Sequence, residues 1–250
     1  MARPMTEEYS EDIQTRFELA ISRRVLPSWG WRDFKDSPAL RRKVIEDLRE
    51  KGGRARTVER LARFGKPALN LMEQCLEAAD TTAQEVAQDF QGQGEISSAM
   101  ISILAGNEVW LKWMLKNNAN PLWKDFGGRG AANYFFNPRY MNRIFETEDI
   151  GEKDLTQAKI IRWARGQSRC IEILQKHNKG QTWRILTTYK DLNNKTVQEY
   201  TQDNLAKTNN SSWTRVLDEK GRSEFRKSLL SGQIMCTSGL KGNKAVKPSI

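Results

Sequence analysis

Few residues in this sequence could form a catalytic centre of a familiar kind. His177 is the only histidine, so neither a histidine-based triad nor a multi-histidine metal site can be built within the chain. We expect His177 to end a helix, where an imidazole complements the last carbonyl groups. Cys75 and Cys170 belong to no C-x-x-C motif and fall on predicted helices, which favours small buried hydrophobes. This inventory predicts a protein that is not an enzyme and uses no metal or cofactor.

Two short motifs carry groups that enzymes use, but their context favours structural roles. Gly127-Gly128-Arg129-Gly130 precedes a predicted helix. A phosphate-binding loop would need a preceding strand and a following Gly-Lys-Ser/Thr, and neither is present. Asp218-Glu219-Lys220 combines acidic and basic groups, but it lies on no predicted strand and has no partner carboxylate. We therefore expect both segments to be turns.

The apolar spacing is typical of short paired helices. Ser37-Pro38 predicts a helix start, with serine as the N-cap and proline at the first helical position. Turn-forming residues then separate the predicted helices of each pair at Gly65, Gly106, Asn137 and Gly166, at intervals of 41, 31 and 29 residues. Paired helices at such intervals indicate a solenoid, because one pair is too small to bury its apolar face alone.

Residues 99–130 resemble an ankyrin repeat. The matching segments are Ala105-Gly106-Asn107 between the helices, Met114-Leu115 on the second helix, Asn118-Ala119-Asn120-Pro121 after it, and Lys124-Asp125 with Gly128-Arg129 in the next β-turn finger. A second finger of similar sequence spans residues 190–197, and residues 76–80 resemble a helix-to-finger junction. The threonine-proline-leucine-histidine signature is absent, with Gly130 in place of its threonine, although Thr196 retains that residue.

The resemblance covers about residues 55–205 and implies an all-α fold whose fingers contact a partner. Another helical-hairpin array is the alternative. The predicted organisation is an N-terminal helical cap over 1–54, the repeat array over 55–205, C-terminal capping helices over 206–236 and a flexible basic tail over 237–250. The interval of 41 residues predicts an insertion around residues 81–94, and residues 178–190 exceed a standard connection.

The charge is uneven. The chain carries a net charge of +10, and residues 161–250 contain 17 basic and seven acidic side chains. Such asymmetry favours an acidic partner, although solvated cations that keep a thin fold soluble are an equal alternative. No apolar run is long enough to cross a membrane, no secretion signal is recognisable, and three widely spaced cysteines favour free thiols. We therefore expect a cytoplasmic protein.

The predicted finger tip near residue 125 is the candidate partner-binding site. Its residues combine aromatic and cationic side chains, and the second finger adds two lysines. The full set is Trp123, Lys124, Phe126, Arg129, Lys190 and Lys195. If the two aromatic side chains are exposed, they can anchor a partner; the alternative is that they fold back over the array.

The leading hypothesis is a protein-binding adaptor or inhibitor with an acidic protein partner. The asparagine- and lysine-rich second half is what AT-rich coding gives, which favours a bacterial or phage accessory factor that blocks a competitor's machinery. The alternative is a nucleic-acid-binding protein that uses the basic C-terminal third and the basic helix near residues 41–66. In that helix the candidate phosphate contacts are Arg54, Arg56, Arg60 and Arg63.

Overall fold

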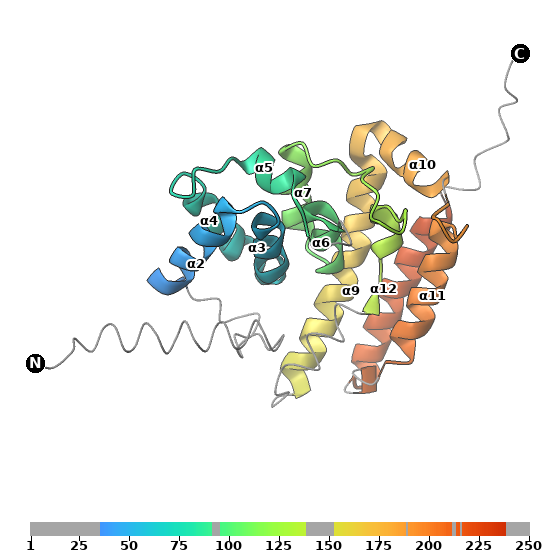
Figure 1. Cartoon of the computed structure of the whole chain (residues 1–250). Coiled ribbons are helices and arrows are strands. Elements are labelled where there is room, and N and C mark those ends of the chain that lie inside the picture. The colour runs from blue at the N-terminus through green and yellow to red at the C-terminus, as the bar shows by residue number, and fades with distance from the viewer. Residues whose placement is uncertain are drawn as a thin grey trace, which may run out of the picture.

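The computed structural model describes residues 36–91, 96–138, 153–188, 190–211, 214–215 and 217–238. Over these residues the protein is mostly helical, as the all-α prediction requires, and its one strand pairing joins β1 to β2 (Figure 1). The α-helices are α2 (Pro38–Arg49), α3 (Gly53–Leu61), α4 (Lys66–Cys75), α5 (Ala83–Gln88), α6 (Ser98–Leu104), α7 (Glu108–Lys116), α9 (Lys153–Lys176), α10 (Gln181–Thr188), α11 (Val197–Asn209) and α12 (Glu219–Ser238). The 3₁₀ helices are η1 (Ala62–Phe64), η2 (Ala131–Tyr134) and η3 (His177–Gly180), and the strands are β1 (Phe90–Gln91) and β2 (Ile96–Ser97).

Polar side chains start several helices, and the one at Ser37 was predicted. The Ser37 hydroxyl accepts a hydrogen bond from the Leu40 amide, and Pro38 follows at the first helical position of α2. Asn107 caps α7 and Thr196 caps α11; Thr196 forms a reciprocal capping box with Glu199. These contacts satisfy amides that a helix leaves unpaired at its N-terminus, which fixes where each helix begins.

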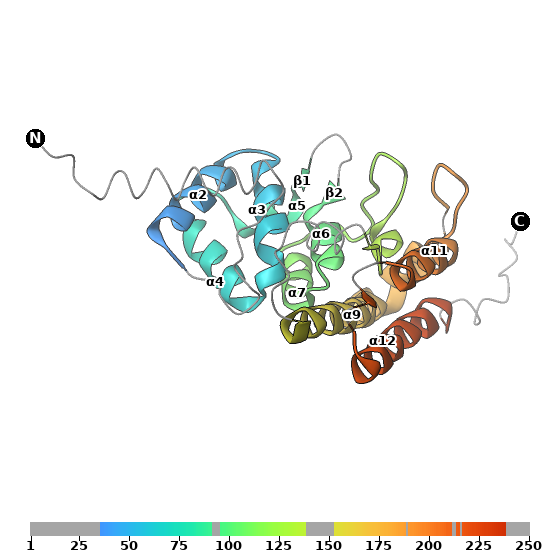
Figure 2. The same cartoon turned by 90° about the horizontal axis from the view of Figure 1, so that it is seen from below.

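In Figure 2, α2 and α4 lie at one end of the molecule and α11 and α12 at the other, with α3, α6, α7 and α9 between them. One continuous apolar core runs through them. Its largest fully buried side chains include Trp110, Trp163, Phe135 and Phe136. The arrangement therefore places successive turns and loops along the edges of an extended body.

Polar side chains connect each helical unit to the turn before it. Asn107 and Trp110 donate to backbone carbonyls of the 62–65 turn, and α9 and α11 repeat the arrangement with two donors each. The bonds are Asn107 Nδ2 to Ala62 O (2.5 Å), Trp110 Nε1 to Gly65 O (2.9 Å), Trp163 Nε1 to Leu104 O (2.9 Å), Gln167 Nε2 to Ile103 O (2.6 Å), Asn204 Nδ2 to Phe135 O (2.9 Å) and Thr208 Oγ1 to Phe136 O (3.0 Å). Because buried carbonyls must be paired, these bonds fix the register of neighbouring units.

The predicted turn at Gly166 is wrong. The helix α9 continues through this residue for 24 residues without interruption. A Cβ at position 166 would overlap the carbonyl of Gly106, whose φ of +61° makes the tight turn between α6 and α7. Glycine therefore serves at position 166 to let α9 cross that turn closely, and not to break a helix.

Other expectations for the chain are met in part. The turns at Gly65 and Gly106 separate helices as predicted, and the insertion near residues 81–94 contains α5 and the strand β1. The long connection after α9 contains η3 and α10. The last helix, α12, reaches Ser238, two residues into the predicted tail. Some predictions lie outside the described residues. They are the first helix of the N-terminal cap, the helix expected over residues 140–145 after the turn at Asn137, and the rest of the tail.

Candidate binding edge

Two loops, with the residues that directly precede them, carry the predicted partner-binding residues. We call residues 125–134 the first finger loop and residues 191–200 the second finger loop. Each begins with an aspartate, and each ends with a tyrosine nine positions later. Figure 2 shows both loops extending from the same edge of the molecule.

In the first finger loop the Asp125 carboxylate organises the backbone. One of its oxygens accepts the Arg129 amide (2.8 Å), and the other accepts Arg129 Nε (2.8 Å) and the Tyr134 hydroxyl (2.5 Å). The Asp125 side chain is fully buried. The turn closes through Gly128 N to Asp125 O (2.8 Å), with Gly128 at a φ of +72°. A buried carboxylate with three donors holds such a loop rigidly.

The second finger loop repeats this geometry with different residues. The Lys195 amide donates to the Asp191 carboxylate (2.8 Å), and the Tyr200 hydroxyl donates to its second oxygen. Asn194 takes the place of Gly128, with a φ of +62° and its amide 3.0 Å from Asp191 O. Burial acts to raise the pKa of Asp191, but hydrogen bonds from Tyr200, Lys195 and Asn193 outweigh it and leave the pKa below its usual value. The carboxylate is therefore ionised at neutral pH.

The two finger loops touch each other and present matching apolar tips. The Leu192 amide donates to the Gly127 carbonyl (3.2 Å), so the loops lie side by side. Phe126 and Leu192 occupy the position directly after the aspartate in each loop, and each is 78% exposed. The Phe126 ring therefore projects into solvent and does not fold back over the helices.

Trp123 precedes the first finger loop and, unlike Phe126, packs partly against a neighbouring ring. Its ring is half-buried and stacks on Phe90 of β1, with centroids 5.3 Å apart and planes 18° apart. The Lys51 ammonium lies 5.5 Å from the Phe90 ring centre. Trp123 therefore packs partly on its neighbour, and Phe126 is the more exposed of the two predicted aromatic anchors.

The predicted cations lie around the tips, and Arg129 and Lys195 hold the same place in their respective loops. Arg129 pairs with Asp125 and lies over the Tyr134 ring, 5.7 Å from its centre. Lys195 pairs with Asp203 (2.9 Å) and lies over the Tyr200 ring, in the same relative position as Arg129 in the first loop. Lys124 and Lys190 are exposed. The edge thus combines two apolar tips with a surrounding positive charge.

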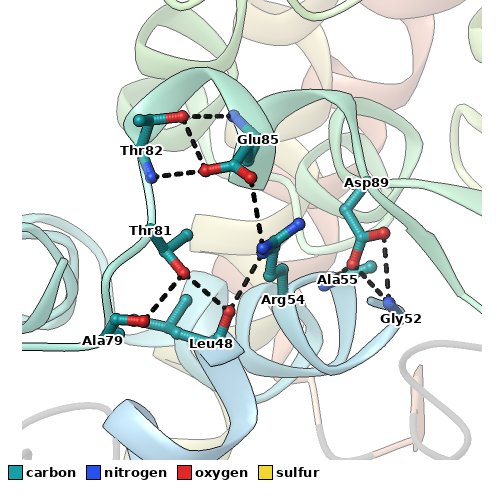
Figure 3. Close-up of polar contacts among 9 residues, drawn as sticks. All are labelled: Leu48, Gly52, Arg54, Ala55, Ala79, Thr81, Thr82, Glu85 and Asp89. Atoms are coloured by element: carbon teal, nitrogen blue, oxygen red, sulfur yellow. Dashed lines mark hydrogen bonds and ion pairs between the residues drawn. The ribbon is translucent and has the colours of Figure 1, made fainter. Parts of the chain in front are cut away.

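The predicted basic helix is bound into the N-terminal part of the fold. Figure 3 shows Arg54 between α2 and α5: its Nε donates to the Leu48 carbonyl (3.0 Å), and its guanidinium pairs with Glu85 (3.3 Å). In the same region Asp89 accepts the amides of Gly52 and Ala55, which supplies the N-terminal cap that glycine cannot provide for α3 (Figure 3). Arg54 is therefore a structural cation.

The remaining three arginines of this predicted site do not form one open face. Arg60 pairs with the buried Asp47, and Arg63 is buried, with its guanidinium 4.4 Å from the Phe64 ring centre. Arg56 is exposed and pairs with Glu50 (3.1 Å). Arg54, Arg56 and Arg60 therefore each contact the segment 47–50, and Arg63 is buried.

The residues first considered for chemistry lie apart from this edge. His177 starts η3, and its Nδ1 lies 2.8 Å from the Thr182 hydroxyl oxygen. Cys75 and Cys170 are buried free thiols, as predicted, and burial raises the pKa of Cys170. Within the described ranges, no three His, Cys, Asp or Glu residues gather as metal ligands, and no helix is long and apolar enough to cross a membrane.

Sequence reasoning missed Leu192, Phe90 and the two tyrosines of the finger loops. A usable signal was present, because both loops share the spacing Asp-x₃-Arg/Lys-x₄-Tyr. Phe90 had no comparable signal, since its contact with Trp123 depends on the fold. Comparison of the chain with known protein families, characterised proteins and solved structures found no match to any of them. The candidate site is therefore supported by the geometry of the two loops alone.

Proposed function

We propose that this protein binds another protein through the edge formed by its two finger loops, and that it acts as an adaptor or inhibitor without catalysing a reaction. The observation that carries the proposal is the pairing of rigid loops with exposed apolar tips. Phe126 and Leu192 are both 78% exposed, although the loops beneath them are fixed by buried or partly buried hydrogen bonds. Exposed apolar groups on an ordered scaffold are typical of interaction sites.

Rigidity explains why these tips would bind well. Association costs free energy whenever mobile side chains and loops become ordered. Here Asp125 and Asp191 already order the two backbones, and the bond between Leu192 N and Gly127 O sets the spacing of the tips. A partner with a matching apolar surface would meet a preformed site. The cations Lys124 and Lys190 beside the tips favour a partner with acidic groups at the rim of the contact.

The repeated loop geometry also supports an ankyrin-like architecture for the array. Both finger loops have the same aspartate-centred turn, and polar side chains join each unit to the preceding one. In such an architecture each finger projects from one edge of the stack. The long helix α9, which has no break at Gly166, departs from a strict helical-hairpin repeat.

Binding of nucleic acid through the basic helix near residues 41–66 is the weaker candidate. A phosphate contact needs an arginine whose guanidinium reaches solvent. Arg54, Arg60 and Arg63 instead make contacts within the fold. Releasing them to bind phosphates would break the contacts that hold α2, α3 and α5 together.

Affinity capture with the full chain tests the proposal. Lysate, with and without nuclease treatment, is passed over wild-type protein, over Phe126→Ser/Leu192→Ser, and over the control Ile185→Ser, which removes a partly exposed apolar side chain from α10. We expect the wild type and the control to retain the same protein, and the double variant to lose it. Equal capture by all three proteins would reject the finger loops as the contact, and loss of all captured material on nuclease treatment would favour nucleic acid.

A further inference from the structure

A groove lies between α11 and α12 at the C-terminal end of the described helices. It encloses about 670 Å³. Buried apolar side chains form its floor, namely Leu205, Leu217, Phe225 and Leu229. Leu230 stands at its rim and is 57% exposed. The groove is separate from the finger loops, and its arginines belong to the basic C-terminal third.

Three arginines surround this apolar floor. Arg215, Arg222 and Arg226 line the groove, and none of its described lining residues is acidic. Asp218 and Glu219 line the adjoining cavity, which shares the three arginines. Arg222 Nε donates to the Leu217 carbonyl (3.0 Å), which holds that side chain across one end of the groove. Arg215 and Arg226 form no ion pair with any residue that the structure describes. The groove therefore combines a strongly positive rim with an aliphatic base.

We propose that this groove binds an acidic peptide segment of a partner protein, with an aliphatic side chain placed beside its carboxylates. A guanidinium binds a carboxylate through two parallel hydrogen bonds, so the arginine rim is suited to aspartate or glutamate. The leucines beneath it would bury an aliphatic side chain of the same segment. The proposal adds a second contact surface to the protein and does not depend on the finger loops.

The aliphatic floor favours a peptide over a nucleic acid in this groove. Single-stranded nucleic acid is held by bases that stack on aromatic faces. Among the described lining residues the aromatic side chain, Phe225, is buried, whereas leucines form the rest of the floor.

Fluorescence anisotropy with the full chain tests this inference. The probe is a fluorescein-labelled synthetic peptide of about a dozen residues, helical in design, with glutamates on one face and leucines on the other. We expect saturable binding that weakens as salt rises. Arg215→Gln/Arg226→Gln and Leu230→Ser should each lower affinity by about tenfold. The matched control Lys66→Gln/Arg184→Gln, which removes two exposed cations from other helices, should bind like the wild type.

The outcomes separate the alternatives. Preference for a labelled single-stranded oligonucleotide over the peptide would overturn the proposal in favour of nucleic acid. Absence of peptide binding, or equal affinity of the rim variant and the control, would also overturn it. Thermal melts of all variants show whether the fold is kept. Phe126→Ser/Leu192→Ser should bind the peptide normally, so this test can fail without touching the function proposed for the finger loops.

Discussion

Each finger loop depends on the carboxylate of one aspartate, whose two oxygens both accept hydrogen bonds. In the first loop both the Tyr134 ring and the Asp125 carboxylate that its hydroxyl donates to are buried. In the second loop the Asp191 carboxylate is also buried, but the Tyr200 ring that donates to it is partly exposed. Once the hydroxyl is removed, water can replace it more easily at the partly exposed position than at the buried one. The same tyrosine should therefore matter more in the first loop.

This difference predicts unequal losses of stability. Tyr134→Phe should lower the free energy of unfolding by about 2 kcal/mol, and Tyr200→Phe by about 1 kcal/mol. Each change removes only the hydroxyl and keeps the ring. Urea unfolding followed by circular dichroism measures both values. A larger loss for Tyr200→Phe would contradict the burial argument.

The lowered pKa of Asp191 predicts a specific dependence on pH. Hydrogen bonds to the charged form favour folding above the unfolded-state pKa of about 3.9, and this contribution is lost as the pH falls through the lower folded-state pKa. Asp191→Asn should therefore be less stable than the wild type by a constant amount near neutral pH, and the gap should narrow below about pH 4. Unfolding curves across this range check the prediction, and a gap that stays constant into acid would count against it.

At the scale of elements, α9 is positioned by the close approach of two glycines. The carbonyl of Gly106 occupies the space where a side chain at Gly166 would begin. In an ordinary helix interior, alanine is more favourable than glycine by up to about 1 kcal/mol. At position 166 the clash should reverse that preference.

Gly166→Ala should therefore destabilise the protein by about 1–3 kcal/mol. Ala206→Gly on the exposed face of α11 is the control, and it should cost about 1 kcal/mol through propensity alone. Thermal unfolding of both variants makes the comparison. Stabilisation by Gly166→Ala would show that α9 does not pack against the Gly106 turn as described.

Local signals predicted those elements whose ends depend on neighbouring residues. Ser37-Pro38 and Gly106-Asn107 fixed helix boundaries because capping and turn formation act over a few residues. Gly166 was misread because a glycine required by a distant backbone looks the same in sequence as one required by a turn. For the candidate site, Phe126 was correctly expected at an exposed tip, whereas Leu192 and Phe90 depend on which loops the fold brings together.

At the scale of the whole molecule, the proposed functions lie on separate surfaces. The finger loops form one edge of the row of helices (Figure 2). The groove is lined by residues of α11 and α12 and of the loop between them, and these two helices lie at the C-terminal end of the row (Figure 1). The predicted nucleic-acid contacts lie at the opposite end, where ion pairs with Glu85, Glu50 and Asp47 occupy them. A partner that covered both the edge and the groove would gain affinity from two independent contacts.

The central claim is that Phe126 and Leu192 contact the partner without supporting the fold. The most direct measurement is the affinity of Phe126→Ser/Leu192→Ser for the captured protein by titration calorimetry, together with its melting temperature. We expect the double variant to bind at least about thirtyfold more weakly, equivalent to about 2 kcal/mol of binding free energy. Its melting temperature should stay near that of the wild type because both side chains are exposed. Unchanged affinity with a lowered melting temperature would contradict it.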